Sequence, residues 1–423
     1  MSVPLKELFK AGVRAVQGDT AVAAALSEQP LASNAPVYVL AIGKAASAMT
    51  QGAIDALPDR PIAGLLITKP DHLTPDIRNT SWLGVIESSH PVPSDQSLLA
   101  GAAAVEFIKS IPSNAQLLVL LSGGASALME HLIDGLGLSD LQDLNETLIA
   151  GGFPIGQMNA LRKTLSAIKG GKLCHHLPNI PVTQLVISDV PGDVLSDIGS
   201  GPLMLPLSED YIHPGEILAN AKAKVSSDVL ACVNAFGITP PAPTHWVWDN
   251  IQTRIVGSSR IAQEAVITAV KNFDLPDHCV TQLEAELNGD VSVTAKQIAH
   301  TLLSDKSLFV RVWGGETHCV LPKNPGRGGR NQHLALSIAM LIAGEKNLRV
   351  LCCGTDGSDG PTGDAGALVS GNTIAQGEAL GLSAEAYLAK ADAGSYLEAV
   401  NALVTTGPTG TNVMDLVIAC NLT

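Results

Sequence analysis

Two glycine-bearing segments place polar groups directly after short apolar runs. Gly43 and Lys44 follow VYVLAI, residues 37–42, and the run LLVLL, residues 117–121, leads into SGGAS, residues 122–126. A lysine among the free backbone N–H groups of a helix start suits an anion, and a glycine turn can wrap a phosphate with its N–H groups. The alternatives are a surface lysine on an ordinary turn and the close packing of a tight turn.

Carboxylates gather in two further loops. Asp189 and Asp193 lie in SDVPGD, and Asp356 and Asp359 lie in GTDGSDG. Mg²⁺ prefers one or two carboxylates together with waters and phosphate oxygens, so these loops could hold it. The alternative is that the aspartates cap helices and close turns, which Asp and Ser commonly do.

The segment PGRGGRNQ, residues 325–332, is the most unusual. It carries Arg327 and Arg330 among glycines, in a chain with 26 Lys and Arg against 40 Asp and Glu. Guanidinium forks match carboxylates and phosphates, so we interpret this segment as an anion-binding loop. Together the loops offer cations for phosphates, carboxylates for Mg²⁺ and amides for oxyanions, as phosphoryl transfer from ATP to a hydroxy acid requires.

His90, in SSHPVP, could act as a base. A lone histidine in a proline-containing segment is more often structural, so we do not count His90 among the expected site residues.

Strands and helices must position these loops. Apolar runs at 37–42, 64–68, 117–121 and 184–187 alternate with helical segments and predict a parallel, doubly wound sheet that binds ligands beyond the carboxyl ends of its strands. In the second half we expect strands at 245–248, 308–313 and 349–353, and helices at 259–272, 292–303 and 332–343. GITPPAP, residues 237–243, is the best linker candidate.

Composition and charge exclude several classes of protein. The apolar residues are 46% of the chain but aromatics only 3%, as expected for buried parallel strands covered by helices. A net charge of −14 argues against nucleic acid or anionic membrane as partner. We see no signal peptide and no apolar segment near the ~20 residues that span a bilayer. Scattered cysteines fit a reducing cytoplasm, so we expect a cytoplasmic monomer or homodimer.

The common nucleotide-binding fingerprints are absent from the sequence. Neither Gly43-Lys44 nor Gly171-Lys172 has the glycine six residues ahead of the lysine, or the Ser or Thr after it, that a P-loop requires. No G-x-G-x-x-G follows an expected strand, which weakens the case for a nicotinamide-dependent dehydrogenase.

Nine segments carry a resemblance to a known family. In chain order they are AIGKAASAM, SSHPVPSDQS, LSGGASALM, MNALRKTLSAIKGGKL, SDVPGDVLSDIGSGP, GGETHCVLP, GRGGRNQ, GTDGSDGPTGDAGA and TTGPTGTNVMDL. The set resembles the glycerate 2-kinase family, with a DUF4147 region and a C-terminal MOFRL region, and covers nearly the whole chain. Some members have been called hydroxypyruvate reductase, so NAD(P)H-dependent reduction of hydroxypyruvate is the alternative function.

The resemblance implies an α/β fold of two domains with the active site in the cleft between them. Residues 1–240 would form a three-layer, Rossmann-like domain with a mostly parallel sheet, and residues 241–423 a smaller α/β domain with a mixed sheet. The implied reaction is ATP-dependent phosphorylation of D-glycerate at its 2-hydroxyl, which gives 2-phosphoglycerate and ADP.

The resemblance also implies roles for individual residues. Lys44 and Arg330 would be the principal catalytic cations and bind the γ-phosphate and the glycerate carboxylate. Asp189 or Asp193, with Asp356 or Asp359, would hold Mg²⁺ or accept the hydroxyl proton, and Asp189 is the favoured catalytic carboxylate. The residues expected to bind substrate or ATP are Gly43, Ser122, Gly123, Gly124, Ser126, Asp193, Glu316, Arg327, Asn331, Thr355 and Asp356.

Two departures from the family pattern stand out. His333 follows GGRNQ, where an acidic residue is usual, and Glu130 and His131 replace an apolar or proline context. Both concern fine substrate preference more than reaction type.

Overall fold

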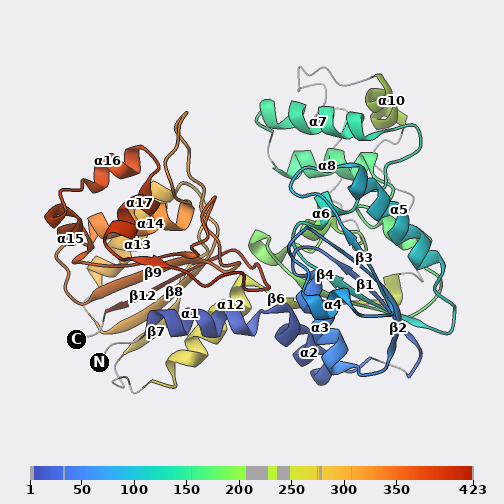
Figure 1. The fold of residues 1–423 in the computed structure, drawn as a ribbon, viewed down its shortest axis with the longest axis horizontal. Coiled ribbons are helices and arrows are strands. Elements are labelled where there is room, and N and C mark those ends of the chain that lie inside the picture. The colour runs from blue at the N-terminus through green and yellow to red at the C-terminus, as the bar shows by residue number, and fades with distance from the viewer. Residues whose placement is uncertain are drawn as a thin grey trace. The chain divides into compact units, whose positions relative to one another are not determined.

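The structure is a computed structural model that describes residues 4–31, 34–153, 155–205, 227–235, 248–273, 275, 279–305 and 307–421. The chain forms two compact units (Figure 1). The first unit is residues 18–256, and the second is residues 1–17 together with 257–423. In the described part of the chain, no helix has the length and apolar character needed to cross a membrane.

The two units divide the chain differently from the expected domains 1–240 and 241–423. Helix α1 (Leu5–Ala15) belongs to the second unit, where it packs on α12 (Ser259–Val270), and β6 (Ile251–Gly257) joins the sheet of the first unit. The expected linker, residues 237–243, lies outside the described residues. Long-range pairing decides which unit an element joins, and order along the chain does not reveal it.

The first unit is built on a six-stranded sheet in the order β3-β2-β1-β4-β5-β6. Besides β6, its strands are β1 (Val37–Ile42), β2 (Pro61–Thr68), β3 (Leu83–Glu87), β4 (Gln116–Leu121) and β5 (Val182–Ile187). The strands from β3 to β5 pair in parallel, so their carboxyl ends meet at one edge. The expected parallel sheet is confirmed, with β3 and β6 as strands that the sequence pattern did not predict.

Helices cover both faces of this sheet. Leu40 and Ile42 of β1 pack in one core with Ala100 of α5, whereas the alternating residues Val39 and Ala41 point to the other face, where α3 contacts β1 and β2. The helices are α2 (Gly18–Glu28), α3 (Ala46–Ala56), α4 (Pro75–Arg78), α5 (Asp95–Lys109), α6 (Ala125–Leu128), α7 (Leu138–Ala150), α8 (Ile155–Leu165) and α10 (Ser227–Ala235). Short 3₁₀ turns are η1 (Lys172–His176), η2 (Pro191–Asp193) and η3 (Ile198–Ser200).

The second unit has a six-stranded mixed sheet in the order β11-β10-β9-β12-β8-β7. Its strands are β7 (Val280–Leu283), β8 (Phe309–Gly315), β9 (Leu348–Gly354), β10 (Gly366–Ser370), β11 (Leu403–Val404) and β12 (Asp415–Asn421). Only β7 and β8 pair in parallel among these strands. This mixed sheet confirms the expected fold class.

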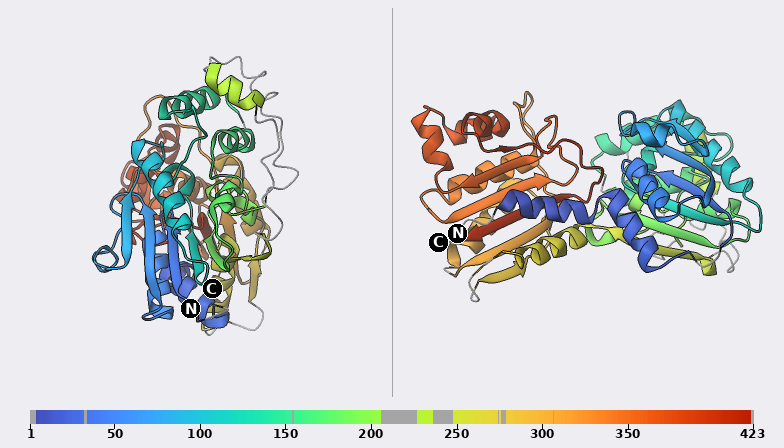
Figure 2. Two further views of the ribbon diagram at one scale, coloured as in Figure 1. Left: turned by 90° about the vertical axis from the view of Figure 1, so that its right-hand side faces the viewer. Right: turned by 60° about the horizontal axis from the view of Figure 1, so that its bottom comes forward.

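Helices also cover both faces of the second sheet. They are α13 (Val291–Ser304), α14 (Arg330–Leu341), α15 (Thr373–Ala379), α16 (Ala384–Ala389) and α17 (Ala393–Ala399) on one face, with α1 and α12 on the other (Figure 1). Helix α1 runs along the strands (Figure 2) and contacts β9 and β12. It buries Leu5, Leu8, Phe9, Gly12 and Val13, the spacing of one helix face.

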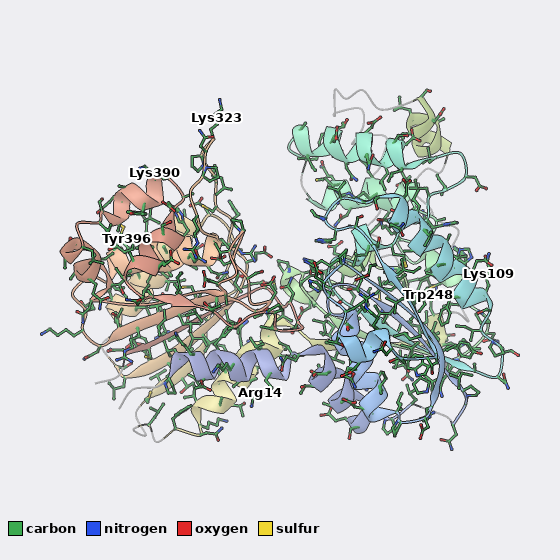
Figure 3. The ribbon with its side chains drawn as sticks, in the orientation of Figure 1. Arg14, Lys109, Trp248, Lys323, Lys390 and Tyr396 are labelled. Atoms are coloured by element: carbon green, nitrogen blue, oxygen red, sulfur yellow. The ribbon has the colours of Figure 1, made fainter. Side chains whose placement is uncertain are left out.

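The expected strand at 245–248 is not seen. Residues 245–247 lie outside the described part of the chain, and Trp248 (Figure 3) lies in a helical turn. The aromatic run favours a strand by composition, but Trp248 packs against the core of the first unit instead.

Candidate active site

The carboxyl ends of β1, β4 and β5 bring three predicted features together in the first unit. A Cβ on Gly123 would collide with the Asp189 carboxylate, and a Cβ on Gly124 would lie 3.3 Å from Lys44 Cε. Gly124 also has φ +84°, in the left-handed region that favours glycine. We call this cluster of Lys44, Gly123, Gly124 and Asp189 the Lys44 site.

The backbone N–H groups of Lys44 and Ala45, just before α3, are not free, contrary to our expectation. Lys44 N–H donates to the Gly123 carbonyl at 3.0 Å, and Ala45 N–H donates to Ser122 Oγ at 3.1 Å. Thr68 Oγ1 donates to the Gly43 carbonyl at 2.9 Å. The predicted Gly43 and Ser122 therefore brace neighbouring turns, because the parallel strands end side by side and the turns satisfy each other.

Two kinds of donor remain available in the Lys44 site. Among the described residues, neither an ion pair nor a hydrogen bond engages the Lys44 ammonium, and no acceptor takes the N–H groups of residues 123–126. The Ser126 hydroxyl, by contrast, is shared with Ser200 Oγ at 2.6 Å. The turn thus presents a cation and several N–H donors to the same place, an arrangement that suits a phosphate.

Asp189 is the carboxylate of the Lys44 site. Burial raises its pKa, and the positive charge of Lys44 acts in the opposite direction. A carboxylate with raised proton affinity accepts a proton more readily than an exposed aspartate does. Asp193 lies four residues on, at the end of η2, and Asp197 pairs with Lys163 at 3.7 Å.

His90, which follows β3, was not among the expected site residues. Its Nε2 lies 3.2 Å and its Cδ2 3.0 Å from the position of a Cβ on Gly124. Burial and the positive charges of Lys44, Lys69 and His72 lower the pKa of His90 to about 4, so its ring is neutral at neutral pH. The segment SSHPVP marked His90 as a possible base, but β3, the strand that positions it, was not predicted from the sequence.

Arg330 is the cation of the second unit, and carboxylates hold it. It begins α14, and its Nε–H and Nη2–H groups donate to Asp415 at 2.6 Å and 3.0 Å. Its Nη1–H donates to Glu316. Burial alone would lower the pKa of Arg330, but the hydrogen bonds and charge of Asp415 outweigh burial and raise it. The structure therefore joins the predicted Arg330 and Glu316, and adds Asp415, which the sequence analysis missed.

Asp359, an expected metal ligand, has another role. Its Oδ1 accepts the Asn331 N–H at 3.0 Å and its Oδ2 accepts the Gln332 N–H at 2.7 Å, so it satisfies N–H groups at the start of α14. Burial raises the pKa of Asp359 to about 7, although these hydrogen bonds lower it. With both oxygens engaged by the helix, Asp359 is a helix-capping residue in this structure rather than a free ligand.

The other residues expected in the second unit stabilise its loops. Asn331 Nδ2 donates to Asp415 at 2.9 Å, which adds it to the Arg330 cluster. Arg327 pairs with Asp364 at 3.1 Å and with Glu398 at 2.6 Å. Thr355 Oγ1 donates to the Met414 carbonyl at 2.6 Å, and Asp356 accepts the N–H of Ser358 at 2.9 Å.

The departures from the family pattern are buried or partly buried. The Glu130 carboxylate is fully buried, pairs with Lys169 and accepts the Ser166 hydroxyl at 2.5 Å. His333 lies 3.8 Å from Cys319 Sγ, and burial lowers its pKa. Glu130 therefore stabilises the first unit from within, and its carboxylate is engaged by protein groups.

Within the described residues, no group of three or more His, Cys, Asp or Glu side chains could hold a metal ion. Mg²⁺ that arrives with ATP needs only one or two carboxylates, because phosphate oxygens and waters complete its shell. Asp189 fits this requirement, since no side-chain donor engages it among the described residues. Asp359 does not fit.

Comparisons with known proteins agree with this architecture. Residues 4–234 match a family described as a domain of unknown function, DUF4147, and residues 309–415 match the MOFRL family. D-glycerate 2-kinase of Thermotoga maritima is 33% identical over 97% of this chain and 96% of its own. An Agrobacterium vitis protein with the provisional name hydroxypyruvate reductase is 33% identical over 89% of this chain and 97% of its own.

Similarity extends to a solved structure. The crystal structure of glycerate kinase from Thermotoga maritima matches with a TM-score of 0.87 and 30% identity, and covers 98% of each chain. The two family matches and the near-complete coverage together show that this chain belongs to the glycerate 2-kinase family, in which a DUF4147 domain precedes a MOFRL region.

Proposed function

We propose that this protein is a glycerate 2-kinase, which transfers the γ-phosphoryl group of ATP to the 2-hydroxyl of D-glycerate. One observation carries the proposal: the Lys44 ammonium has no partner among the described residues and adjoins a glycine turn with available N–H donors. The similarity to D-glycerate 2-kinase of Thermotoga maritima supports the substrate.

The Lys44 site suits the charge that develops during phosphoryl transfer. The oxygens of the transferring group carry negative charge, and catalysis depends on positioning and electrostatic stabilisation. Lys44 would neutralise part of that charge, and the N–H groups of the Gly123–Gly124 turn would donate hydrogen bonds to the phosphate oxygens without reorganisation.

Asp189 is the proposed proton acceptor. The 2-oxygen of glycerate forms a bond to the γ-phosphorus while the bond from that phosphorus to the bridging oxygen of ADP breaks. The hydroxyl proton passes to the Asp189 carboxylate, whose pKa is raised by burial. Products are 2-phosphoglycerate and ADP.

Arg330 is proposed to bind the glycerate carboxylate, a role that rests on the family motif. The 2-hydroxyl is the hydroxyl nearest the carboxylate, so an enzyme that anchors the carboxylate restricts the position of the 2-hydroxyl more than that of the 3-hydroxyl. This supports the 2-position over the 3-position.

Mg²⁺ is proposed to accompany ATP, with Asp193 and one oxygen of Asp189 as its protein ligands, which would leave the other oxygen of Asp189 to accept the hydroxyl proton. It would offset the negative charge of the phosphates. Turnover should stop after exhaustive chelation and return when Mg²⁺ is added. The Asp189→Asn variant should require more Mg²⁺ than wild type, and turnover that persists without divalent ions would contradict this part of the proposal.

Feeding the product to enolase tests the reaction. Purified protein with ATP, Mg²⁺ and D-glycerate should yield phosphoenolpyruvate when enolase is present without a mutase. A strict need for phosphoglycerate mutase would show that the 3-hydroxyl is the acceptor. The alternative, hydroxypyruvate reductase, predicts loss of NADH absorbance with hydroxypyruvate, and we expect none.

A further inference from the structure

We propose that Asp415 positions Arg330, and that Glu316 pairs with Arg330 until the carboxylate of the substrate replaces Glu316. The inference rests on the proposed function, because it assumes an anionic substrate group at Arg330. It assigns a positioning role to Asp415 and gives Glu316 the role of an internal competitor for the substrate carboxylate.

Asp415 is a rigid anchor. It is the first residue of β12, in register with Gly315 of β8 on one side and Gly354 of β9 on the other. Its side chain is 2% exposed, and it accepts two hydrogen bonds from Arg330 and one from Asn331. Breaking a buried ion pair leaves an uncompensated charge, so this contact should persist when a ligand binds.

Glu316 is an exchangeable partner. It directly follows β8 and accepts a hydrogen bond from Nη1 of Arg330, whereas Asp415 accepts from Nε and Nη2. The side chains of Arg330 and Glu316 are 35% and 40% exposed. Exposed ion pairs are worth little, and a carboxylate on the substrate offers a guanidinium the same oxygens. Replacing Glu316 at Arg330 by a substrate carboxylate should therefore cost less free energy than replacing Asp415.

The local charge balance favours exchange over addition. Arg330 is one positive charge, and the carboxylates of Asp415, Glu316 and Asp359 all act on it. These carboxylates would repel a further anion unless one of them moved away from Arg330. Asp415 and Asp359 are buried, so Glu316 is the one that can turn into water.

The Glu316→Gln variant tests the competitor. It keeps the shape of the side chain but removes the charge, so the KM for D-glycerate should fall about 2- to 5-fold, with kcat nearly unchanged. The matched control is Glu398→Gln, since Glu398 is the exposed partner of Arg327 in the same unit, and its KM should not move. An unchanged or higher KM in Glu316→Gln would overturn the competitor role.

The Asp415→Asn variant tests positioning. It should lower kcat about 10-fold or more. Arg330→Lys should lower kcat little further in that background, because both changes disturb the same Arg330–Asp415 ion pair. Full additivity would overturn the positioning role. If Asp415→Asn does not fold, the Glu316→Gln variant still tests whether the effect depends on Arg330. The lower KM for D-glycerate that Glu316→Gln produces should be lost when that change is combined with Arg330→Lys.

Direct binding separates this inference from the proposed function. Calorimetry with D-glycerate should show tighter binding by Glu316→Gln than by wild type, whether or not turnover occurs. Turnover by wild type with equal binding by both proteins would overturn the inference alone. Binding of glycerate by neither protein would overturn both.

Discussion

The Lys44 site and the Arg330 cluster look alike in sequence and differ in structure. Each places a cation beside glycines at the start of a helix. Yet the Lys44 ammonium has no bonded partner among the described residues, whereas Arg330 donates to two carboxylates. A glycine-rich motif therefore supplies a cation and a close backbone, but other strands decide whether that cation is available.

The two sheets explain the difference. In the parallel sheet of the first unit, strand ends bring Asp189 near Lys44, with no hydrogen bond or ion pair between them among the described contacts, and glycine turns fill the remaining space. In the mixed sheet of the second unit, antiparallel β12 begins where β8 and β9 end, which sets Asp415 against Arg330. Reversing one strand thus brings a buried carboxylate to the edge where the cation lies.

Removing the available cation should have the largest effect. Lys44→Met keeps much of the side-chain volume but loses the charge, so kcat should fall at least ~10²-fold, the scale of losing one electrostatic stabiliser. Steady-state kinetics with ATP and D-glycerate measure this. Lys109→Met on α5 (Figure 3) is the control, because Lys109 is exposed and pairs only with Glu106 among the described residues. Full turnover in Lys44→Met would make Lys44 an ordinary surface lysine.

Filling the glycine turn should come next. Gly123→Ala would push the new methyl group into the Asp189 carboxylate, so we expect kcat to fall about 10²-fold, the lower range for losing a general base. Gly156→Ala in α8 is the matched control, since nothing lies within 4 Å of its added Cβ. Wild-type kinetics in a folded Gly123→Ala variant would show that Asp189 can move without loss.

Changing the held cation should cost less. Arg330→Lys keeps the charge but loses the planar fork that bonds Asp415 through two nitrogens, so we expect about a 10-fold loss of kcat/KM. Arg327→Lys is the control, because Arg327 pairs with Asp364 and Glu398 by single contacts. A greater loss in Arg327→Lys than in Arg330→Lys would show that the other arginine of the loop carries the function.

The smallest expected effect is on stability at low pH. The pKa of His90 is lowered to about 4 in the folded protein, below the 6.5 of a free histidine, so the unfolded chain binds more protons between these values. Stability should therefore fall as pH drops from about 6.5 to 4. His90→Gln should weaken that dependence in urea unfolding curves, and an identical pH dependence would mean that His90 titrates normally.

Local sequence patterns were enough to predict the strands that carry the Lys44 site. Mainly apolar runs at β1, β4 and β5, each followed within two residues by glycine or aspartate, are local patterns, and the order of such runs is enough to align their carboxyl ends. Lys44, Gly123, Gly124 and Asp189 could therefore be predicted together. The family resemblance likewise depends on local motifs.

Tertiary structure alone decided which polar groups are occupied. Asp415 reaches Arg330 only because β12 inserts between β8 and β9, and Asp359 caps α14 from a loop 27 residues beyond Gln332. Likewise α1 and β6 join units that their place in the chain does not suggest. Such pairings depend on contacts between distant segments, and no local spacing of residue types encodes which carboxylate will satisfy which donor.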